Sequence, residues 1–351
     1  MILYLHIPFC DSKCGYCAFY SQTNQKHLFS PYIKALEIDL KYQLEYYSVK
    51  SIESVFIGGG TPNILDSKAY KQIFTLINPL LVSGAEVSIE ANVNLISKSW
   101  CDDLVSLGAN RLSVGVQSFY EDKLELLERK HKVKDIAKSL ELASSFKNKS
   151  IDLIYDTALD SLARLKHELD CALQLDINHI SCYSLSIDKD SSFGLKNANH
   201  KASLESQSSF IKQLLESYGA FQYEVSNFAL PYKCKHNLAY WEGKDYLGVG
   251  ASSVSKIDIK PNGASRLYAS KDLSEYIKHP TKRVKEPLSE ADLQTERLFL
   301  GLRSEVGVST KDYSFKLLES LKDKIYIKGD HFFAKDLFLA DEIALWLLRR
   351  S

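Results

Sequence analysis

The strongest constraint on the fold is a regular alternation of two sequence patterns along residues 1–229. Short runs of β-branched and apolar residues are each followed by a longer stretch with the apolar spacing of a helix. The runs cover residues 2–7, 54–57, 86–90, 111–116, 150–155 and 179–185. The helical stretches cover residues 31–47, 67–81, 97–107, 121–146 in two pieces, 162–173 and 203–218. Because a parallel strand must be reached through a crossover helix, this alternation predicts an α/β fold with a parallel sheet.

The number of these units limits the architecture further. A closed βα-barrel needs about eight units, and the sequence offers six, so we expect a partial (βα)6 barrel. In such folds the chemistry gathers at the carboxyl ends of the strands. Polar or glycine residues stand within or just after five of the predicted strands, namely Cys10, the triple glycine 58–60, Glu90, Gln117 and Asp152. We expect these positions to converge.

The pattern changes after residue 229, and a chain of 351 residues exceeds the usual size of one core. Residues 230–270 are rich in aromatic, glycine and serine residues without a clear period, which predicts an extended or short-stranded region. We take this bridging region to run to residue 287. Residues 288–351 show helical patterns at 290–303, 313–321 and 340–348, with a short strand pair at 325–333. We therefore predict three parts, 1–229, 230–287 and 288–351, the last a smaller helix-rich domain for which a winged-helix-like arrangement is one option.

Charge and hydropathy exclude some partners. The 44 basic residues equal the 44 acidic residues, so no overall field draws the protein to nucleic acid or to an anionic membrane. The first ten residues are apolar but lack the basic start and cleavage site of a signal peptide. No segment offers the unbroken apolar stretch of a bilayer span. We expect a cytoplasmic protein that does not cross the membrane and binds no nucleic acid.

Three of the seven cysteines form a tight group, Cys10, Cys14 and Cys17. An odd total with four scattered singles does not form a disulfide framework, and a clustered trio in a reducing compartment indicates metal. Three thiolates from one loop can hold three irons of a cubane cluster and leave the fourth iron open. A structural zinc site fits less well because it is closed by four protein ligands. The remaining alternative is three unconnected buried cysteines.

The residues around this trio carry a family resemblance. The segment from Cys10 to Phe19, Cys-x-x-x-Cys-x-Tyr-Cys-x-Phe, resembles the signature of radical S-adenosylmethionine (SAM) proteins. Motifs from Tyr4 to Ser309 resemble the family of oxygen-independent coproporphyrinogen III oxidases and their relatives, the HemW-type heme chaperones. The resemblance implies a [4Fe-4S] cluster on Cys10, Cys14 and Cys17 with SAM bound beside it.

The same resemblance implies a set of SAM-binding residues. Each of them alone has an ordinary explanation, such as a tight turn, a solvated strand-end acid or an ion-paired arginine, and it is their joint order along the chain that resembles the family. The turn from Gly58 to Pro62 reads Gly-Gly-Gly-Thr-Pro, and glycine there would let the backbone approach the ligand. The implied SAM contacts are Tyr4, Gly59, Gly60, Thr61, Glu90, Gln117, Arg129 and Asp152.

Two features favour the chaperone branch of this family. The oxidases resembled here carry a fourth cysteine where this chain has Phe19, and they have a longer N-terminal extension. The chaperones carry His-Asn-x-x-Tyr-Trp, which this chain matches at His236, Asn237, Tyr240 and Trp241. An imidazole can ligate heme iron and aromatic rings can cover a porphyrin. The alternative is that His236 is an ordinary packed or surface histidine.

We therefore carry two functional hypotheses from the sequence. The first is a HemW-like heme chaperone that binds a cluster, SAM and heme and delivers heme to a membrane respiratory heme protein. The second is an enzyme that decarboxylates coproporphyrinogen III to protoporphyrinogen IX through a SAM-derived radical. Glu128 and residues 156–159 depart from the family's glycine-containing loops, which favours SAM binding over SAM cleavage. A zinc-bearing interaction module is a third alternative.

Overall fold

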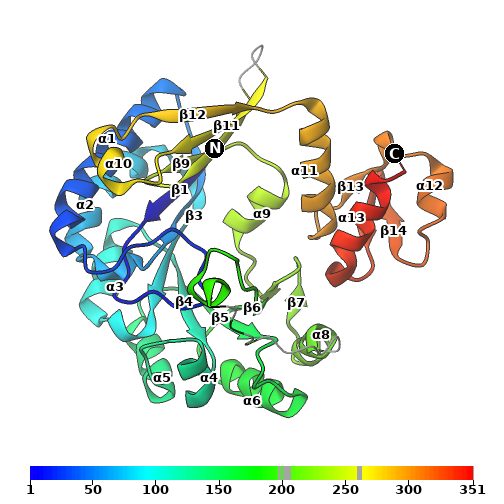
Figure 1. The fold of residues 1–351 in the computed structure, drawn as a ribbon, viewed down its shortest axis with the longest axis horizontal. Helices are drawn as coiled ribbons and strands as arrows, with labels where there is room; N and C mark the ends of the chain where they lie inside the picture. Colours follow the sequence, from blue (N-terminus) through cyan, green and yellow to red (C-terminus); the bar gives the residue numbers. More distant parts are fainter. Residues whose placement is uncertain (197, 199, 201–206, 259–262, 351) are drawn as a thin grey trace.

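Six parallel strands form the centre of the protein, as the sequence alternation predicts. The computed structural model describes residues 1–196, 198, 200, 207–258 and 263–350. The parallel strands lie side by side in chain order (Figure 1). They are β1 (Ile2–Ile7), β2 (Ile52–Gly59), β3 (Leu81–Asn92), β4 (Arg111–Gln117), β5 (Asn148–Tyr155) and β6 (His179–Ser184). The α/β class and the parallel order are thus confirmed.

The crossover helices fall where the apolar periodicity predicts them. They are α1 (Phe29–Tyr46), α2 (Lys71–Ile77), α3 (Lys98–Leu107), α4 (Glu121–Leu126), α5 (Val133–Leu142), α6 (Leu162–Leu173) and α8 (Gln207–Ser217). The expected start of the last helix, residues 203–206, lies outside the described residues. Short 3₁₀ turns η3 (Ser67–Tyr70) and η4 (Asn78–Leu80) flank α2, so the predicted stretch 67–81 is divided. Proline at residue 79 lacks the N–H that a longer helix would use.

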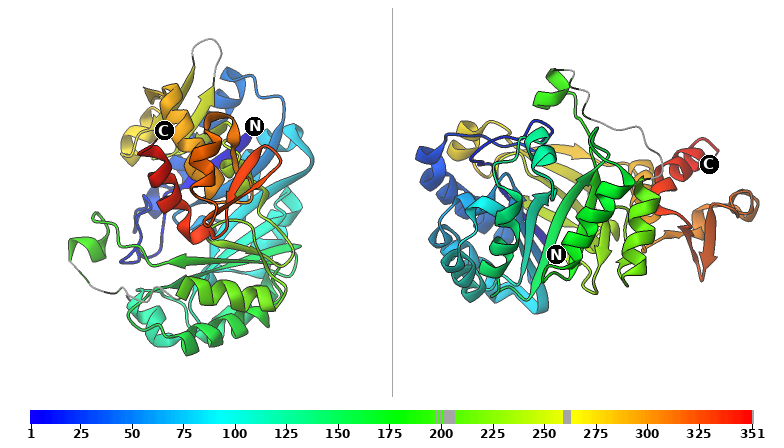
Figure 2. Two further views of the ribbon diagram at one scale, coloured as in Figure 1. Left: turned by 90° about the vertical axis from the view of Figure 1, so that its right-hand side faces the viewer. Right: turned by 90° about the horizontal axis from the view of Figure 1, so that it is seen from below.

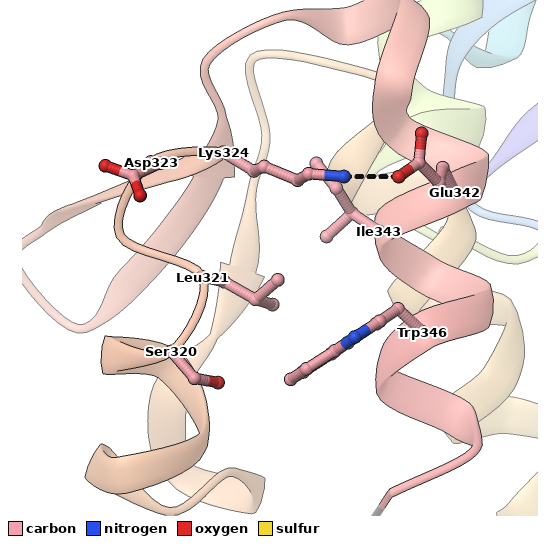
Figure 3. Close-up of a pocket in the computed structure, with 7 residues that line it drawn as sticks. All are labelled: Ser320, Leu321, Asp323, Lys324, Glu342, Ile343 and Trp346. Atoms are coloured by element: carbon pink, nitrogen blue, oxygen red, sulfur yellow. Dashed lines mark hydrogen bonds and ion pairs between the residues drawn. The ribbon is translucent and has the colours of Figure 1, made fainter.

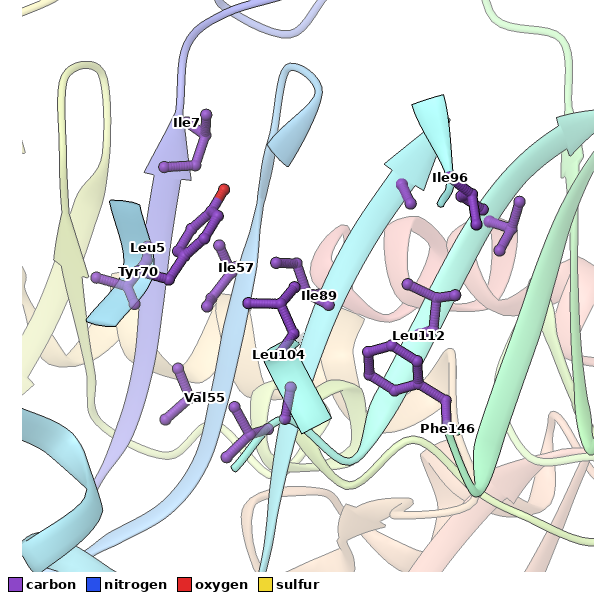
Figure 4. Packing of buried hydrophobic residues seen from close by; sticks show 14 of the residues in the cluster. Leu5, Ile7, Val55, Ile57, Tyr70, Ile89, Ile96, Leu104, Leu112 and Phe146 are labelled. Carbon is purple, nitrogen blue, oxygen red and sulfur yellow. The ribbon is translucent and has the colours of Figure 1, made fainter. Parts of the chain in front are cut away.

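The main core lies between the sheet and these helices. Alternate residues of the strands point to one face, and β-branched or leucine side chains such as Val55, Ile57 and Ile89 occupy it with almost no exposed surface. Leu104 of α3 and Phe146 after α5 pack onto the same face (Figure 4). The opposite face of the strands therefore points away from this core, and it carries the polar residues of the site.

Residues 221–287 extend the same sheet rather than forming a separate layer. Strands β7 (Phe221–Gln222) and β8 (Asn227–Ala229) continue it beyond β6, and β9 (Tyr246–Val249) pairs in parallel with β1. Antiparallel strands β10 (Val254–Asp258), β11 (Ala264–Ala269) and β12 (Arg283–Pro287) complete a twelve-stranded sheet. Two helices lie within this region, α9 (Lys235–Trp241) and α10 (Leu273–Lys278). The sequence did not predict α9, because seven residues are too few for a clear helical period.

The last part of the chain has its own small sheet and apolar cluster. It contains α11 (Glu290–Leu302), β13 (Val308–Ser309), α12 (Phe315–Glu319), β14 (Ile325–Lys328), β15 (His331–Ala334) and α13 (Ala340–Leu348). This unit projects from one side of the sheet (Figures 1 and 2). Glu296 of α11 accepts hydrogen bonds from Lys256 and Arg266, which attaches the unit to β10 and β11. Among the described helices, none is both long enough and apolar enough to cross a bilayer.

Candidate functional site

The three clustered cysteines lie on the loop that follows β1. The Cys10 N–H donates to the carbonyl of Gln22, and the Gln22 N–H donates to the carbonyl of Pro8, so the ends of the loop are held together. The Cys17 N–H donates to the carbonyl of Cys14 and closes a turn between them. Cys10 is buried, whereas Cys14 and Cys17 are partly exposed. Burial raises the pKa of the Cys10 and Cys17 thiols, so their deprotonation costs more than in water. Metal coordination offsets this cost because it stabilises the thiolates.

The three thiols on this loop are ligands of the kind that iron-sulfur clusters use. Among the described residues, no three histidine, cysteine or acidic side chains are gathered closely enough to hold one metal ion. A cubane cluster places each thiolate on a different iron and so accepts a wider spacing. Three free thiols on one loop, two of them partly exposed, fit such a cluster.

A chain of side-chain contacts connects two of the cysteines through the strand ends. Arg129, in the loop after α4, places Nη1 3.5 Å from the Cys14 Sγ. Its Nη2 donates to the Asn92 Oδ1 at 2.9 Å. The Asn92 Nδ2 donates to the Thr61 Oγ1 at 3.0 Å, and the Thr61 hydroxyl contacts the Cys10 Sγ at 3.3 Å. The loops after β1, β2, β3 and α4 are thereby held in one arrangement.

The glycine turn after β2 packs directly on the backbone that precedes the cysteines. The Gly60 N–H donates to the carbonyl of Ile7 at 2.8 Å, and the Thr61 N–H donates to the carbonyl of Phe9 at 2.7 Å. A Cβ on Gly60 would lie 2.6 Å from the Phe9 carbonyl oxygen. Gly59 has φ +113°, a conformation that side chains other than glycine rarely adopt. The family resemblance explains glycine at these positions by the approach of a ligand. The structure shows a second reason for glycine, because a side chain here would clash with the backbone of the protein or strain its own.

The two acids predicted to bind SAM lie close together on the polar face of the sheet. The Glu90 Oε2 accepts a hydrogen bond from the Gly59 N–H at 3.1 Å. Asp152 on β5 accepts weaker contacts of 3.4 Å from the Ser113 hydroxyl. Withdrawal from water, with a contribution from the nearby Asp152 charge, raises the pKa of Glu90 to about 8. Burial also raises the pKa of Asp152. A cation at this point would stabilise both carboxylates.

The remaining predicted SAM residues border the same place. The Tyr4 hydroxyl shares a hydrogen bond with the His6 Nδ1 at 2.9 Å. Gln117 ends β4 with φ +68°, a strained backbone that costs on the order of 1 to 3 kcal/mol and is typical of functional positions. The side chains of Tyr4, Glu90, Gln117, Arg129 and Asp152 are all partly exposed. The structure therefore brings these predicted residues to one accessible edge of the sheet.

The predicted heme residues lie elsewhere, on α9. His236 is only 1% exposed, its Nδ1 shares a hydrogen bond of 2.9 Å with the Ser54 hydroxyl, and its Nε2 has no hydrogen-bond partner among the described residues. Ser54 stands four residues before Gly58 on β2, which is about 13 Å along a strand. Burial lowers the pKa of His236 to about 4. Its ring is therefore neutral at pH 7, the form that ligates metals.

The rest of the heme motif is more accessible than its histidine. Asn237, Tyr240 and Trp241 are partly exposed. The Tyr240 ring contacts the His236 ring edge-on, with centroids 4.8 Å apart, and Phe56 packs on the same imidazole at 5.3 Å. In this arrangement the histidine is covered, so a porphyrin cannot reach its Nε2.

Three polar residues of the sites were missed by the sequence analysis. They are His6, Glu86 and Asn92, and each shares a strand face with a predicted residue. His6 stands two positions after Tyr4, while Glu86 and Asn92 stand four before and two after Glu90. Because residues two apart point to the same face of a strand, the alternation itself was a usable signal for all three.

A separate cavity of about 190 Å³ lies in the C-terminal unit between the end of α12 and α13 (Figure 3). Leu321, Ile343 and Trp346 form its apolar walls, and the Lys324–Glu342 ion pair closes one side. Sites for drug-sized ligands and cofactors usually measure about 300 to 1,000 Å³. The cavity is therefore too small for heme, and it contains none of the predicted site residues.

Comparisons with known proteins show the family and the fold of this chain. The family model of the Radical SAM superfamily matches residues 4–155. The chain is 34% identical to the heme chaperone HemW of Bacillus subtilis, over 91% of this chain and 87% of that protein. It is 34% identical to the heme chaperone HemW of Escherichia coli, over 74% of this chain and 71% of that protein. Coproporphyrinogen III oxidase (HemN) of Escherichia coli has the same fold, with a TM-score of 0.81 over 98% of this chain and 88% of that one at 23% identity.

Proposed function

This chain belongs to the HemW family of heme chaperones within the radical SAM superfamily, and from that premise we propose that it binds a [4Fe-4S] cluster, SAM and heme and delivers heme to a membrane respiratory heme protein. Seven cysteines without a disulfide among the described residues suit a reducing compartment, so we place the protein in the cytoplasm. The recipient is proposed from the family resemblance.

In this proposal the cluster and SAM occupy the carboxyl ends of the strands. Cys10, Cys14 and Cys17 hold the cluster, which when bound supplies an iron without a protein ligand, to which SAM can chelate. The carboxylates of Glu90 and Asp152 offer acceptors for the amine and ribose of SAM. Within the described part of the chain, the Arg129 Nε has no hydrogen-bond partner. The contacts of Arg129 with Cys14 and Asn92 fix the position of the loop that carries it.

Heme binding is assigned to His236, and one observation carries this assignment. The Nε2 of this neutral imidazole is buried and has no hydrogen-bond partner in the part of the chain that the structure describes, while Nδ1 is bonded to the Ser54 hydroxyl. A buried polar atom without a partner is costly, and a metal-ligating histidine commonly has its second nitrogen hydrogen-bonded in this way. The Tyr240 ring packs edge-on against His236, and Trp241, the next residue, adds a second partly exposed aromatic ring.

Two anaerobic assays on one reconstituted sample test the proposal. Hemin titration should give the absorption bands of a histidine-ligated heme in the wild type and not in His236→Ala. Incubation with coproporphyrinogen III, SAM and a reductant should release no carbon dioxide. A sample that binds no hemin and releases carbon dioxide would replace the chaperone proposal with the oxidase.

A further inference from the structure

Glu86 makes an unusual concentration of contacts with the segment that carries the heme motif. Its carboxylate accepts hydrogen bonds from the Tyr232 hydroxyl at 2.7 Å, the Lys235 N–H at 2.9 Å and the His236 N–H at 3.2 Å. The Cys234 thiol also contacts its Oε1 at 3.3 Å. Glu86 thus joins β3 to the α9 segment, about 150 positions away in the chain, and the Lys235 Nζ adds a bond to the Gly84 carbonyl of β3 at 2.7 Å.

This carboxylate is held in its charged form. Glu86 is 1% exposed, and burial by itself would raise its pKa. The positive charge of Arg111 and the hydrogen bonds from the α9 segment outweigh that effect and lower the pKa below its ordinary value. Hydrogen bonds to an ionised acceptor are roughly twice as strong as neutral ones, so these bonds are a substantial restraint on α9.

By holding α9 in place, these bonds keep His236 of the heme motif covered. With α9 in place, His236 is covered by Phe56 and Tyr240 and bonded to Ser54, and its Nε2 is not accessible. A ligand as large as a porphyrin can reach that nitrogen only if α9 moves away from β2 and β3. Asn237, Tyr240 and Trp241 of the same motif are partly exposed while α9 is in this position.

We propose that Glu86 is a positioning residue that latches α9 over the sheet, and that release of this latch is required before His236 ligates heme. The inference rests on the proposed function for the identity of the ligand. The latch itself rests only on the contacts of Glu86. Heme access is then controlled by the equilibrium between the closed α9 seen here and an opened one.

The test compares amide exchange with heme association in matched variants. Tyr232→Phe removes one hydrogen bond from the α9 segment to Glu86 and keeps the ring. Ser88→Ala is the control, because the Ser88 hydroxyl donates to the same carboxylate from within β3. Losing a hydrogen bond to a buried charge should raise the opened fraction about tenfold in Tyr232→Phe. The Lys235 and His236 amide hydrogens should exchange faster by that factor, and hemin should develop its histidine-ligated bands correspondingly faster, while Ser88→Ala stays near the wild type.

Glu86→Gln should accelerate amide exchange and hemin binding more than Tyr232→Phe does. Retained cluster absorbance in this variant would show that the sheet has folded. Equal exchange and hemin rates in wild type, Tyr232→Phe and Ser88→Ala would overturn the latch. Slower hemin binding in Tyr232→Phe would overturn it as well, because it would mean that the closed α9 is the binding form. If the wild type binds no hemin, the proposed function fails, and the exchange measurement still decides whether Glu86 holds α9.

Discussion

The carboxyl ends of the strands and helix α9 carry the two sets of residues proposed to hold cofactors. The two sets differ in how accessible they are to a ligand. At the strand ends, five predicted SAM side chains are partly exposed, whereas that of Thr61 is buried. The surrounding loops are linked by contacts from Cys14 to Cys10. On α9 the predicted ligand His236 is 1% exposed and covered by aromatic rings. The first site is assembled before any ligand arrives, whereas the second must open. Residues identified from motifs can therefore differ in whether a ligand reaches them without a conformational change.

We expect the strongest loss, that of the cluster itself, from a substitution in the cysteine loop. Cys14→Ser should abolish the visible absorbance of the cluster and most of its bound iron, because a hydroxyl does not replace a thiolate at such a site. Cys171→Ser is the matched control, since this partly exposed thiol lies on α6, away from the cysteine loop. Iron and sulfide analysis after anaerobic reconstitution measures both. A full cluster in Cys14→Ser would contradict the assignment.

The next effect tests whether the two regions are independent. His236→Ala should remove the bands of histidine-ligated heme and leave the cluster absorbance unchanged, because Ser54, which is hydrogen-bonded to His236, lies about 13 Å from Gly58 along β2. Trp241→Ala should weaken hemin binding without changing the ligation spectrum, since a ring provides contact area and no bond to iron. Absorption spectra before and after hemin addition measure both results. Simultaneous loss of cluster and heme in His236→Ala would show that the regions are coupled.

A smaller effect concerns the residue that links the loops of the first site. Asn92→Ala breaks the contacts to Arg129 and Thr61 and should weaken SAM binding about tenfold, while the cluster still forms. Asn94→Ala is the control, because Asn94 reaches the same cysteine loop only through an exposed bond to Asp11. Equilibrium binding of SAM to the reconstituted proteins measures the difference. Equal affinities in the two variants would mean that the linking contacts do not organise the SAM site.

The smallest effect is a pH dependence at Glu90. Its pKa of about 8 means that the carboxyl is mostly protonated at pH 6.5 and loses its proton as pH rises through 8. If the carboxylate form receives the cationic SAM, wild-type affinity should rise by up to about tenfold between pH 6.5 and 8. Glu90→Gln cannot lose a proton at this position. SAM itself titrates equally in both experiments, so the difference between the two pH profiles reports the Glu90 carboxyl alone. Parallel pH profiles would place SAM away from Glu90.

Much of the fold follows from local pattern. The strand Ile2–Ile7 and the helices Leu162–Leu173 and Ala340–Leu348 have the boundaries that periodicity predicts, because alternate burial and helical spacing are properties of consecutive residues. Strand β9 could not be placed in this way. Its four residues are too short for a pattern, and its partner β1 lies more than 240 positions earlier in the chain.

Spacing along the chain and the direction shared by parallel strands were enough to predict the six parallel strands, the cysteine loop and the convergence of strand-end residues. The folded chain was needed to show how Asn92 connects two cysteines, why Gly60 meets the backbone of Phe9, and that Glu86 holds α9 with His236 turned inward. These are contacts between segments far apart in sequence, made by side chains whose partners are set by the packing of the whole sheet. A motif names the residues that can act, and the packing decides which of them are accessible.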